Sequence, residues 1–257
     1  MKKLIGALFT VLLTAVSVAS DGRTYSFINS EVPDFLGTVM VEVDGKPVWF
    51  GSGFVRQSGV KQEFVTAKHV VTLEDEDILS AKLRIFLKSG VIEIPSLLGA
   101  VEKTHTTDIA LIALPAGRDV PAARLSKTLP AIEETVTIYG TGTTSSDFRG
   151  ISRGYYSHKP RVELWQYKVK ARVTAKDVPG CEISVDLCKD FLRALFWSDG
   201  PETKYLAIKP QMKIPDGFSG GPAVNKKGEI VGVYIGGFKD ANTDILTPLI
   251  IALKGGQ

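Results

Sequence analysis

The 257-residue sequence predicts an all-β protein made of two six-stranded antiparallel barrels, followed by a short C-terminal helix. Short runs rich in Val, Ile, Leu and Phe recur along the chain, divided by turn residues, as in small barrels that close their own edges. The runs form two series on either side of residues 115–130, which contain three prolines and few strand formers. Only residues 247–254, a short apolar segment at the end of the sequence, have a clearly helical pattern.

The first series of strands carries a strong hairpin signal. Asp44 and Gly45 stand between its first two runs, and a two-residue turn with positive φ favours this pair. The strands expected in this series are residues 37–43, 48–56, 64–67, 83–87 and 109–113.

The second series follows the proline-containing stretch, which is predicted to link the two lobes. Its expected strands are residues 135–139, 164–173, 194–198, 205–208, 222–224, 229–235 and 244–246. We therefore expect an N-terminal segment and first barrel in residues 21–120, and the linker, second barrel and helix in residues 121–257. Together they would form one functional unit.

The first twenty residues are typical of a secretory signal peptide. Lys2 and Lys3 precede an uncharged apolar run, and Ala19 and Ser20 are small residues suited to cleavage before Asp21. The run of 16 residues, 4–19, is shorter than the ~20 that span a bilayer, which disfavours an uncleaved anchor. The sequence predicts a periplasmic or secreted protein without membrane contact after cleavage.

Export would place the two cysteines in an oxidising compartment. Cys181 and Cys188 flank a strand-like stretch, so a local disulfide is expected, with two buried thiols as the alternative. A zinc site is disfavoured because structural zinc needs four closely grouped ligands. The acidic residues 74–77 are more typical of a solvated loop than of a calcium site, and no metal is expected.

Composition and charge exclude several other classes of protein. Hydrophobic residues make up 44% and charged residues 23%, the balance of an ordinary globular chain. The formal net charge is +3, of which Lys2 and Lys3 supply two, so nothing indicates the concentrated basic face of a nucleic-acid binder. The turn at residues 140–142 lacks the third glycine of a nucleotide-binding loop. No cofactor is expected, and the oligomeric state is left open.

The most informative segment for chemistry is residues 216–222, Asp-Gly-Phe-Ser-Gly-Gly-Pro. A nucleophilic serine needs an exposed hydroxyl on a tight turn, with backbone N–H groups aimed at the same point. Glycines on both sides of Ser219 allow such a turn and bring the amides of Gly217 and Ser219 together. A glycine-rich turn with an incidental serine is the alternative.

Two further residues could complete a catalytic group. His69 directly follows an apolar strand, and Asp108 directly precedes one. A carboxylate at that point can be partly buried and still reach an imidazole. Either residue alone is more often structural, but the order His, Asp, Ser is informative.

Together these segments resemble the trypsin/chymotrypsin-like serine proteases over roughly residues 35–255. The motifs that carry the resemblance are Gly-Ser-Gly-Phe at 51–54, Val-Thr-Ala-Lys-His at 65–69, Asp-Ile-Ala-Leu at 108–111, the strand and Gly-x-Gly turn at 135–143, Gly-Phe-Ser-Gly-Gly-Pro at 217–222 and Ile-Val-Gly-Val-Tyr-Ile-Gly-Gly at 230–237. The 38 residues after Ser219 are too few for the PDZ domain of HtrA-type relatives.

The resemblance implies a chymotrypsin-like fold and a serine endopeptidase that acts on protein or peptide substrates through an acyl-enzyme intermediate. Ser219 would be the nucleophile, His69 the general base, and Asp108 the residue that orients and stabilises the imidazole. The amides of Gly217 and Ser219 would form the oxyanion hole. A protease-like binding module without activity is the alternative, and an esterase is a third possibility.

The resemblance also implies a substrate-binding strand and a primary pocket. Substrate backbone would pair with Ile235, Gly236 and Gly237. Lys213, six residues before Ser219, would lie at the base of the pocket and disfavour Lys or Arg there; alternatively it points to solvent. Either arrangement excludes a preference for basic residues.

The resemblance also bears on activation. Phe218 replaces an aspartate that pairs with a new N-terminus in digestive enzymes, so no proteolytic activation is expected.

Overall fold

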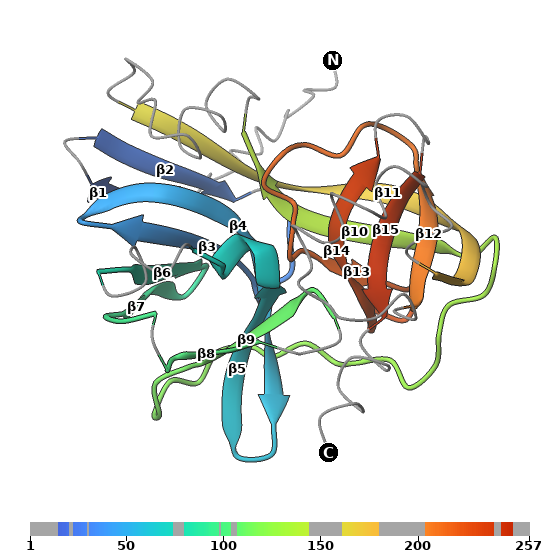
Figure 1. The fold of residues 1–257 in the computed structure, drawn as a ribbon, viewed down its shortest axis with the longest axis horizontal. Helices are drawn as coiled ribbons and strands as arrows, with labels where there is room; N and C mark the ends of the chain where they lie inside the picture. The colour runs from blue at the N-terminus through green and yellow to red at the C-terminus, as the bar shows by residue number, and fades with distance from the viewer. Residues whose placement is uncertain are drawn as a thin grey trace, which may run out of the picture.

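The computed structural model describes residues 15–20, 23–29, 31–73, 80–97, 99–103, 107–143, 161–179, 204–238 and 243–248. Within these residues the chain is almost entirely β-structure in two sheets that lie side by side (Figure 1). The one described helix is η1 (Lys68–Val71), a 3-10 turn. The prediction of an all-β fold is confirmed.

The first sheet has seven strands, all paired antiparallel, in the order β7-β6-β3-β4-β5-β9-β8. They are β3 (Leu36–Val43), β4 (Lys46–Ser58), β5 (Lys61–Ala67), β6 (Lys82–Leu87), β7 (Gly90–Ile94), β8 (Val101–Lys103) and β9 (Ile109–Ala113). β7 and β8 are the edge strands and do not pair with each other within the described residues. This lobe therefore has seven strands where six were expected, and within the described residues its two edge strands do not pair to close it.

Local residue choice explains how this sheet forms. Asp44 and Gly45 have φ of 51° and 74°, the positive values that a two-residue hairpin between β3 and β4 requires, so the predicted turn is confirmed. The ring of Phe64 is fully buried beneath two glycines: a Cβ on Gly37 would lie 2.7 Å from it, and one on Gly53 would overlap it. The glycines thus make room for the aromatic core of the sheet.

The second sheet contains a closed barrel of six antiparallel strands, as the sequence predicted. Its order is β10-β13-β14-β15-β12-β11, and β11 pairs back onto β10. The strands are β10 (Thr135–Gly142), β11 (Arg161–Pro179), β12 (Lys204–Pro210), β13 (Pro222–Val224), β14 (Ile230–Phe238) and β15 (Thr243–Pro248). Fully buried apolar side chains fill its interior, among them Val136, Ile138, Val173, Leu206, Phe218 and Leu246.

β11 is longer than the sequence predicted, and its first residues extend beyond the barrel. They pair in parallel with β2 (Arg23–Asn29), which pairs with β1 (Ala15–Ser20). β1 overlaps the end of the predicted signal peptide, and residues 1–14 lie outside the described residues. Within the described residues, no helix is both long and apolar enough to cross a bilayer.

The predicted linker between the lobes runs along both sheets. The N–H of Ala123 donates to the carbonyl of Val55 at 2.8 Å, and the N–H of Ile230 donates to the carbonyl of Arg124 at 2.8 Å. The segment between β9 and β10 therefore holds one strand of each sheet.

Three further predictions fall wholly or partly outside the described residues. These are the strand at 194–198, the disulfide between Cys181 and Cys188, and most of the helix at 247–254. Thr247 and Pro248 end β15, so the helix prediction was wrong for its first two residues. Thr247 pairs with Val233 of β14, and this pairing favours the strand.

Candidate active site

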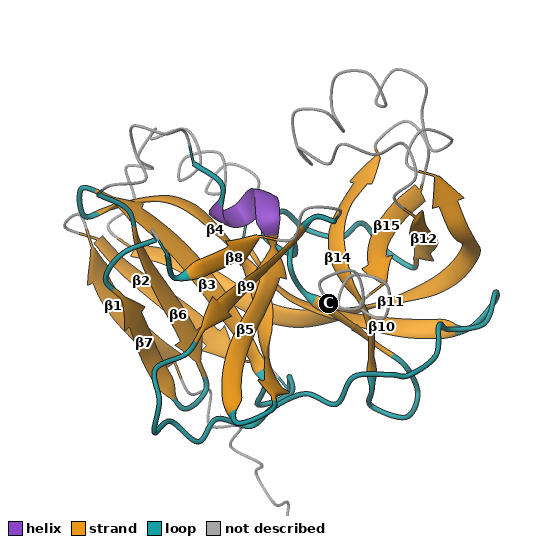
Figure 2. Ribbon diagram, turned by 60° about the horizontal axis from the view of Figure 1, so that its bottom comes forward, coloured by secondary structure: helices purple, strands orange, loops and turns teal. Residues whose placement is uncertain are grey.

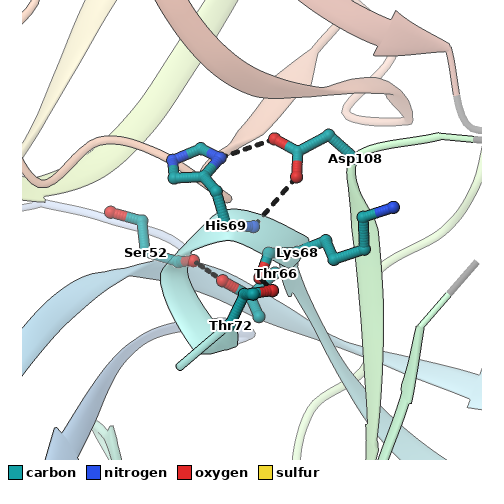
Figure 3. Close-up of polar contacts among 6 residues, drawn as sticks. All are labelled: Ser52, Thr66, Lys68, His69, Thr72 and Asp108. Atoms are coloured by element: carbon teal, nitrogen blue, oxygen red, sulfur yellow. Dashed lines mark hydrogen bonds and ion pairs between the residues drawn. The ribbon is translucent and has the colours of Figure 1, made fainter. Parts of the chain in front are cut away.

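His69 and Asp108 are held together by two hydrogen bonds to one carboxylate (Figure 3). The Nδ1 atom of His69 lies 2.6 Å from Oδ2 of Asp108, and the backbone N–H of His69 donates to Oδ1 at 2.9 Å. The carboxylate therefore fixes both the ring and the backbone of the histidine.

The register of two strands places these residues side by side. Ala67, the last residue of β5, pairs with Ile109, the first residue of β9. The N–H of Lys68 donates to the carbonyl of Asp108 at 3.2 Å, which continues the ladder by one step. His69 follows in the η1 turn, on the side of the first sheet that faces the barrel (Figure 2).

The surroundings of His69 set its protonation. Burial alone lowers the pKa of His69, but the charge of Asp108 and the hydrogen bond to it outweigh this effect and raise the pKa above its usual value. The Asp108 side chain is fully buried, whereas the imidazole keeps 19% of its surface exposed. With Nδ1–H donating to the carboxylate, the neutral ring presents Nε2 as an acceptor.

Ser219 lies in a tight loop between β12 and β13. Gly217 and Gly220 have φ of +95° and +89°, values that residues with a side chain rarely adopt. The Ser219 side chain is partly exposed, and the N–H groups of Gly217 and Ser219 have no acceptor among the described residues. The geometry leaves these two amides available to an anion beside the serine.

Phe218 anchors this loop in the barrel. Its ring is fully buried and meets Tyr167 edge-on, with 5.0 Å between ring centroids. A Cβ on Gly140 would lie 2.6 Å from the same ring, so only a glycine leaves room for it there.

The Ser219 loop also docks on the first sheet, next to His69. The N–H of Ser52 on β4 donates to the carbonyl of Ser219 at 2.7 Å. A Cβ on Gly220 would overlap the carbonyl of Ser52 and lie 2.8 Å from the nitrogen of Ala67, two residues before His69. The structure therefore brings Ser219 to the end of β5 at which His69 and Asp108 meet.

Ser52 is a site residue that was expected only as part of the 51–54 motif, without a role of its own. Its buried hydroxyl donates to the carbonyl of Gly217 at 2.7 Å and accepts from the N–H of Thr141 at 2.7 Å. It thus joins β4, β10 and the Ser219 loop. The available signal was a hydroxyl between two glycines inside the apolar run of residues 48–55, since a buried polar group needs partners.

The four residues predicted to bind substrate lie in two places: Ile235, Gly236 and Gly237 are in β14, whereas Lys213 is in the loop after β12. Gly236 and Gly237 pair with Ile245 and Asp244 of β15 on one edge of β14, and the other edge beyond Tyr234 has no strand partner among the described residues. Ile235 is buried in the same segment. Lys213 is exposed, which favours the alternative in which it points to solvent.

In the described part of the chain, no three His, Cys, Asp or Glu side chains are grouped so that they could hold a metal ion. Residues 74–77, the acidic cluster, lie outside that part.

Comparisons with known proteins identify a family and a fold. Residues 51–233 match the family described as trypsin-like peptidase domain. No curated protein matches the sequence. The active form of the Rv3671c protease from M. tuberculosis has a TM-score of 0.54 at 16% identity, over 86% of this chain and 78% of that chain. A serine endoprotease from Yersinia pestis has a TM-score of 0.52 at 17% identity, over 86% of this chain and 61% of that chain.

Replacing Ser52 tests how the loop is anchored. We expect Ser52→Ala to lower the free energy of unfolding by about 1–3 kcal/mol, because a buried carbonyl and a buried N–H lose their partner. Ser58→Ala, at an exposed position of the same strand, is the matched control. Urea denaturation measures both, and equal stability of the two variants would contradict the anchoring role.

Proposed function

We propose that this chain, which belongs to the trypsin-like peptidase domain family, is a serine endopeptidase. One observation carries the proposal: the buried Asp108 carboxylate holds His69 at the place where the Ser219 loop docks. A nucleophile, a base and an orienting carboxylate are the groups that acyl transfer requires.

The reaction proceeds through an acyl-enzyme. The Ser219 hydroxyl attacks the carbonyl carbon of the peptide, and Nε2 of His69 accepts its proton. Asp108 stabilises the imidazolium that forms, and the amides of Gly217 and Ser219 stabilise the oxyanion. His69 then donates its proton to the leaving amine, and the C–N bond breaks. Water, activated by His69, hydrolyses the ester and restores Ser219.

Substrate binds as an added strand on β14. The edge of Ile235, Gly236 and Gly237 that faces away from β15 offers backbone donors and acceptors to an extended peptide. Gly236 has φ of +150° and open space around its Cα, so no side chain obstructs the approaching chain.

The protein acts outside the cytoplasm in this proposal. Residues 1–20 direct export, and Cys181 and Cys188 then form a local disulfide, for which the sequence pattern is the support. The alternative, a protease-like binding module, shares the fold but not the chemistry, because function depends on the site.

Ser219→Ala tests the nucleophile. We expect kcat for peptide hydrolysis to fall by at least about 10³-fold, since the catalytic group is lost as a unit. Stability should change by less than about 0.5 kcal/mol, because the change is small and lies on a partly exposed turn.

A fluorophosphonate probe separates the enzyme from the binding module. The wild-type chain and Ser58→Ala should label, and Ser219→Ala should not. Labelling of the alanine variant, or a kcat above about a thousandth of the wild-type value, would show that another residue is the nucleophile.

The pH dependence of kcat/KM tests the base. The neutral imidazole accepts the proton, so kcat/KM rises with pH through the His69 pKa and is flat above it. Because Asp108 raises that pKa, the midpoint lies above the ordinary histidine value of 6.5. Asp108→Asn should lower the midpoint, since burial then acts alone, and reduce kcat by about 10⁴-fold. A rate that falls between about pH 5 and 8, around the ordinary histidine pKa, would refute the assignment.

Activity should need no second protease. Phe218 in the barrel core and the Ser52 hydroxyl hold the loop without a charged N-terminus. Purified chain beginning at Asp21 should therefore react with the probe at once. A lag in labelling that disappears when a second protease is added would contradict this expectation.

A further inference from the structure

Two threonine hydroxyls meet where the two sheets contact each other. Thr38 lies on β3 and Thr141 on β10, and their Oγ1 atoms are hydrogen-bonded to each other. The two residues are 103 positions apart in the sequence, and both are fully buried. A buried hydroxyl needs a hydrogen-bond partner, and here each hydroxyl finds one on the other sheet.

The alternation of side chains along β10 turns Thr141 toward the first sheet. Ile138 is buried inside the barrel, whereas Tyr139 packs against the larger hydrophobic cluster, which consists mainly of residues of the first sheet. Thr141 lies two residues after Tyr139 and therefore points the same way, out of the barrel. This direction brings its hydroxyl to Thr38.

Gln166 joins this contact from β11. Its Nε2 atom donates to Oγ1 of Thr38 at 3.3 Å, and its backbone lies opposite Thr141 in the ladder between β10 and β11. On the other side of β11, the residue opposite Gln166 is Asn29 of β2. Neighbouring strands on both sides thus fix the backbone from which this buried amide reaches Thr38.

The backbone of Thr141 carries the contact onward to the Ser219 loop. Its N–H donates to the hydroxyl of Ser52, which in turn donates to the carbonyl of Gly217. The carbonyl oxygen of Thr141 lies 2.7 Å from the position of a Cβ on Gly217, and the ring of Phe50 would overlap that Cβ. Thr141 therefore borders Gly217 with its carbonyl and holds it through Ser52 with its N–H.

Gly217 needs this support because its amide stabilises the oxyanion in the proposed mechanism. A glycine with φ of +95° has wide conformational freedom, and a rotation of its backbone would aim the N–H away from Ser219. Oxyanion stabilisation depends on donors that are held in place before the reaction begins. Ser52 fixes the carbonyl of this glycine, and Thr141 fixes the hydroxyl of Ser52.

We infer that Thr38 is a positioning residue for the oxyanion hole. By binding the side chain of Thr141, it holds the Thr141 backbone and, through Ser52, keeps the Gly217 amide directed at the oxyanion. The inference rests on the proposed function, in which that amide stabilises the transition state. Thr38 lies outside the catalytic group and acts only through Thr141.

Two replacements of Thr38 separate its hydroxyl from its shape. Thr38→Val keeps the shape and should lower kcat for the best-cleaved member of a quenched-fluorescent peptide library by about 10- to 100-fold, less than the loss of a whole oxyanion donor. KM should change by less than about 2-fold, since the lost interaction acts in the transition state. Thr38→Ser keeps the hydroxyl and should retain kcat within about 3-fold of the wild-type value. Thr137→Val, at a partly exposed position on the same face of β10, is the matched control.

The aldehyde analogue of the same peptide gives a readout that a purely structural role would not move. Its adduct with Ser219 places an oxygen at the oxyanion amides, so Thr38→Val should weaken the aldehyde by the same factor as kcat. The midpoint of the pH profile should stay at the wild-type value, because threonine, serine and glutamine side chains do not titrate near neutral pH. The double variant Thr38→Val/Thr141→Val should lose no more activity than the worse single variant, since both changes remove one bond.

The outcomes distinguish this inference from the proposed function. Urea denaturation gives the folded fraction of each variant, and kcat is expressed per folded molecule. An unchanged kcat in Thr38→Val, an equal loss in Thr38→Ser, a loss confined to KM, or multiplied losses in the double variant would overturn the role of Thr38 and leave the peptidase intact. If Thr38→Val does not fold, Thr141→Val and Thr141→Ser provide the same comparison. A wild-type chain that hydrolyses no library peptide and does not label with the fluorophosphonate probe refutes the proposed function, and this inference with it.

Discussion

The site depends on one contact between the two lobes: the docking of the Ser219 loop on β4. Ser52 makes this contact with its backbone and its hydroxyl, and so fixes the carbonyls of both Gly217 and Ser219. Gly220 is essential to it, because any side chain there would collide with Ser52 and with the end of β5. His69 belongs to one sheet and Ser219 to the other, so chemistry between them is possible only while this contact holds.

In the first sheet, one set of hydrogen bonds both stabilises Asp108 and orients His69. A fully buried carboxylate is costly unless it is hydrogen-bonded. Asp108 meets this condition by accepting from both the backbone and the ring of His69. The bonds that make its burial tolerable are also the bonds that orient the imidazole, so stability and preorganisation have one origin here.

Sequence reasoning was strongest where a pattern has a local cause. The Asp44–Gly45 turn, most strand positions and the closed second barrel follow from turn chemistry and from short apolar runs. The pairing of His69 with Asp108 was also expected, from the order of His69, Asp108 and Ser219 and the resemblance of their segments to a known family. The pairing of β2 with β11 depends on long-range register, which no local pattern encodes. The contacts of Ser52 and Thr38 were missed for the same reason: their partners are distant in sequence.

Tyr234 connects the Ser219 loop with β15, two segments that are apart in the sequence. Its backbone holds Gly220 and Gly221, and its hydroxyl holds Asp244. The register shift between Tyr234 and Gly236 turns the strand just after this residue, so that Gly237 meets Asp244. The Ser219 loop, β14 and β15 are thus joined through a single buried tyrosine, whose ring packs in the barrel core and has little freedom to move.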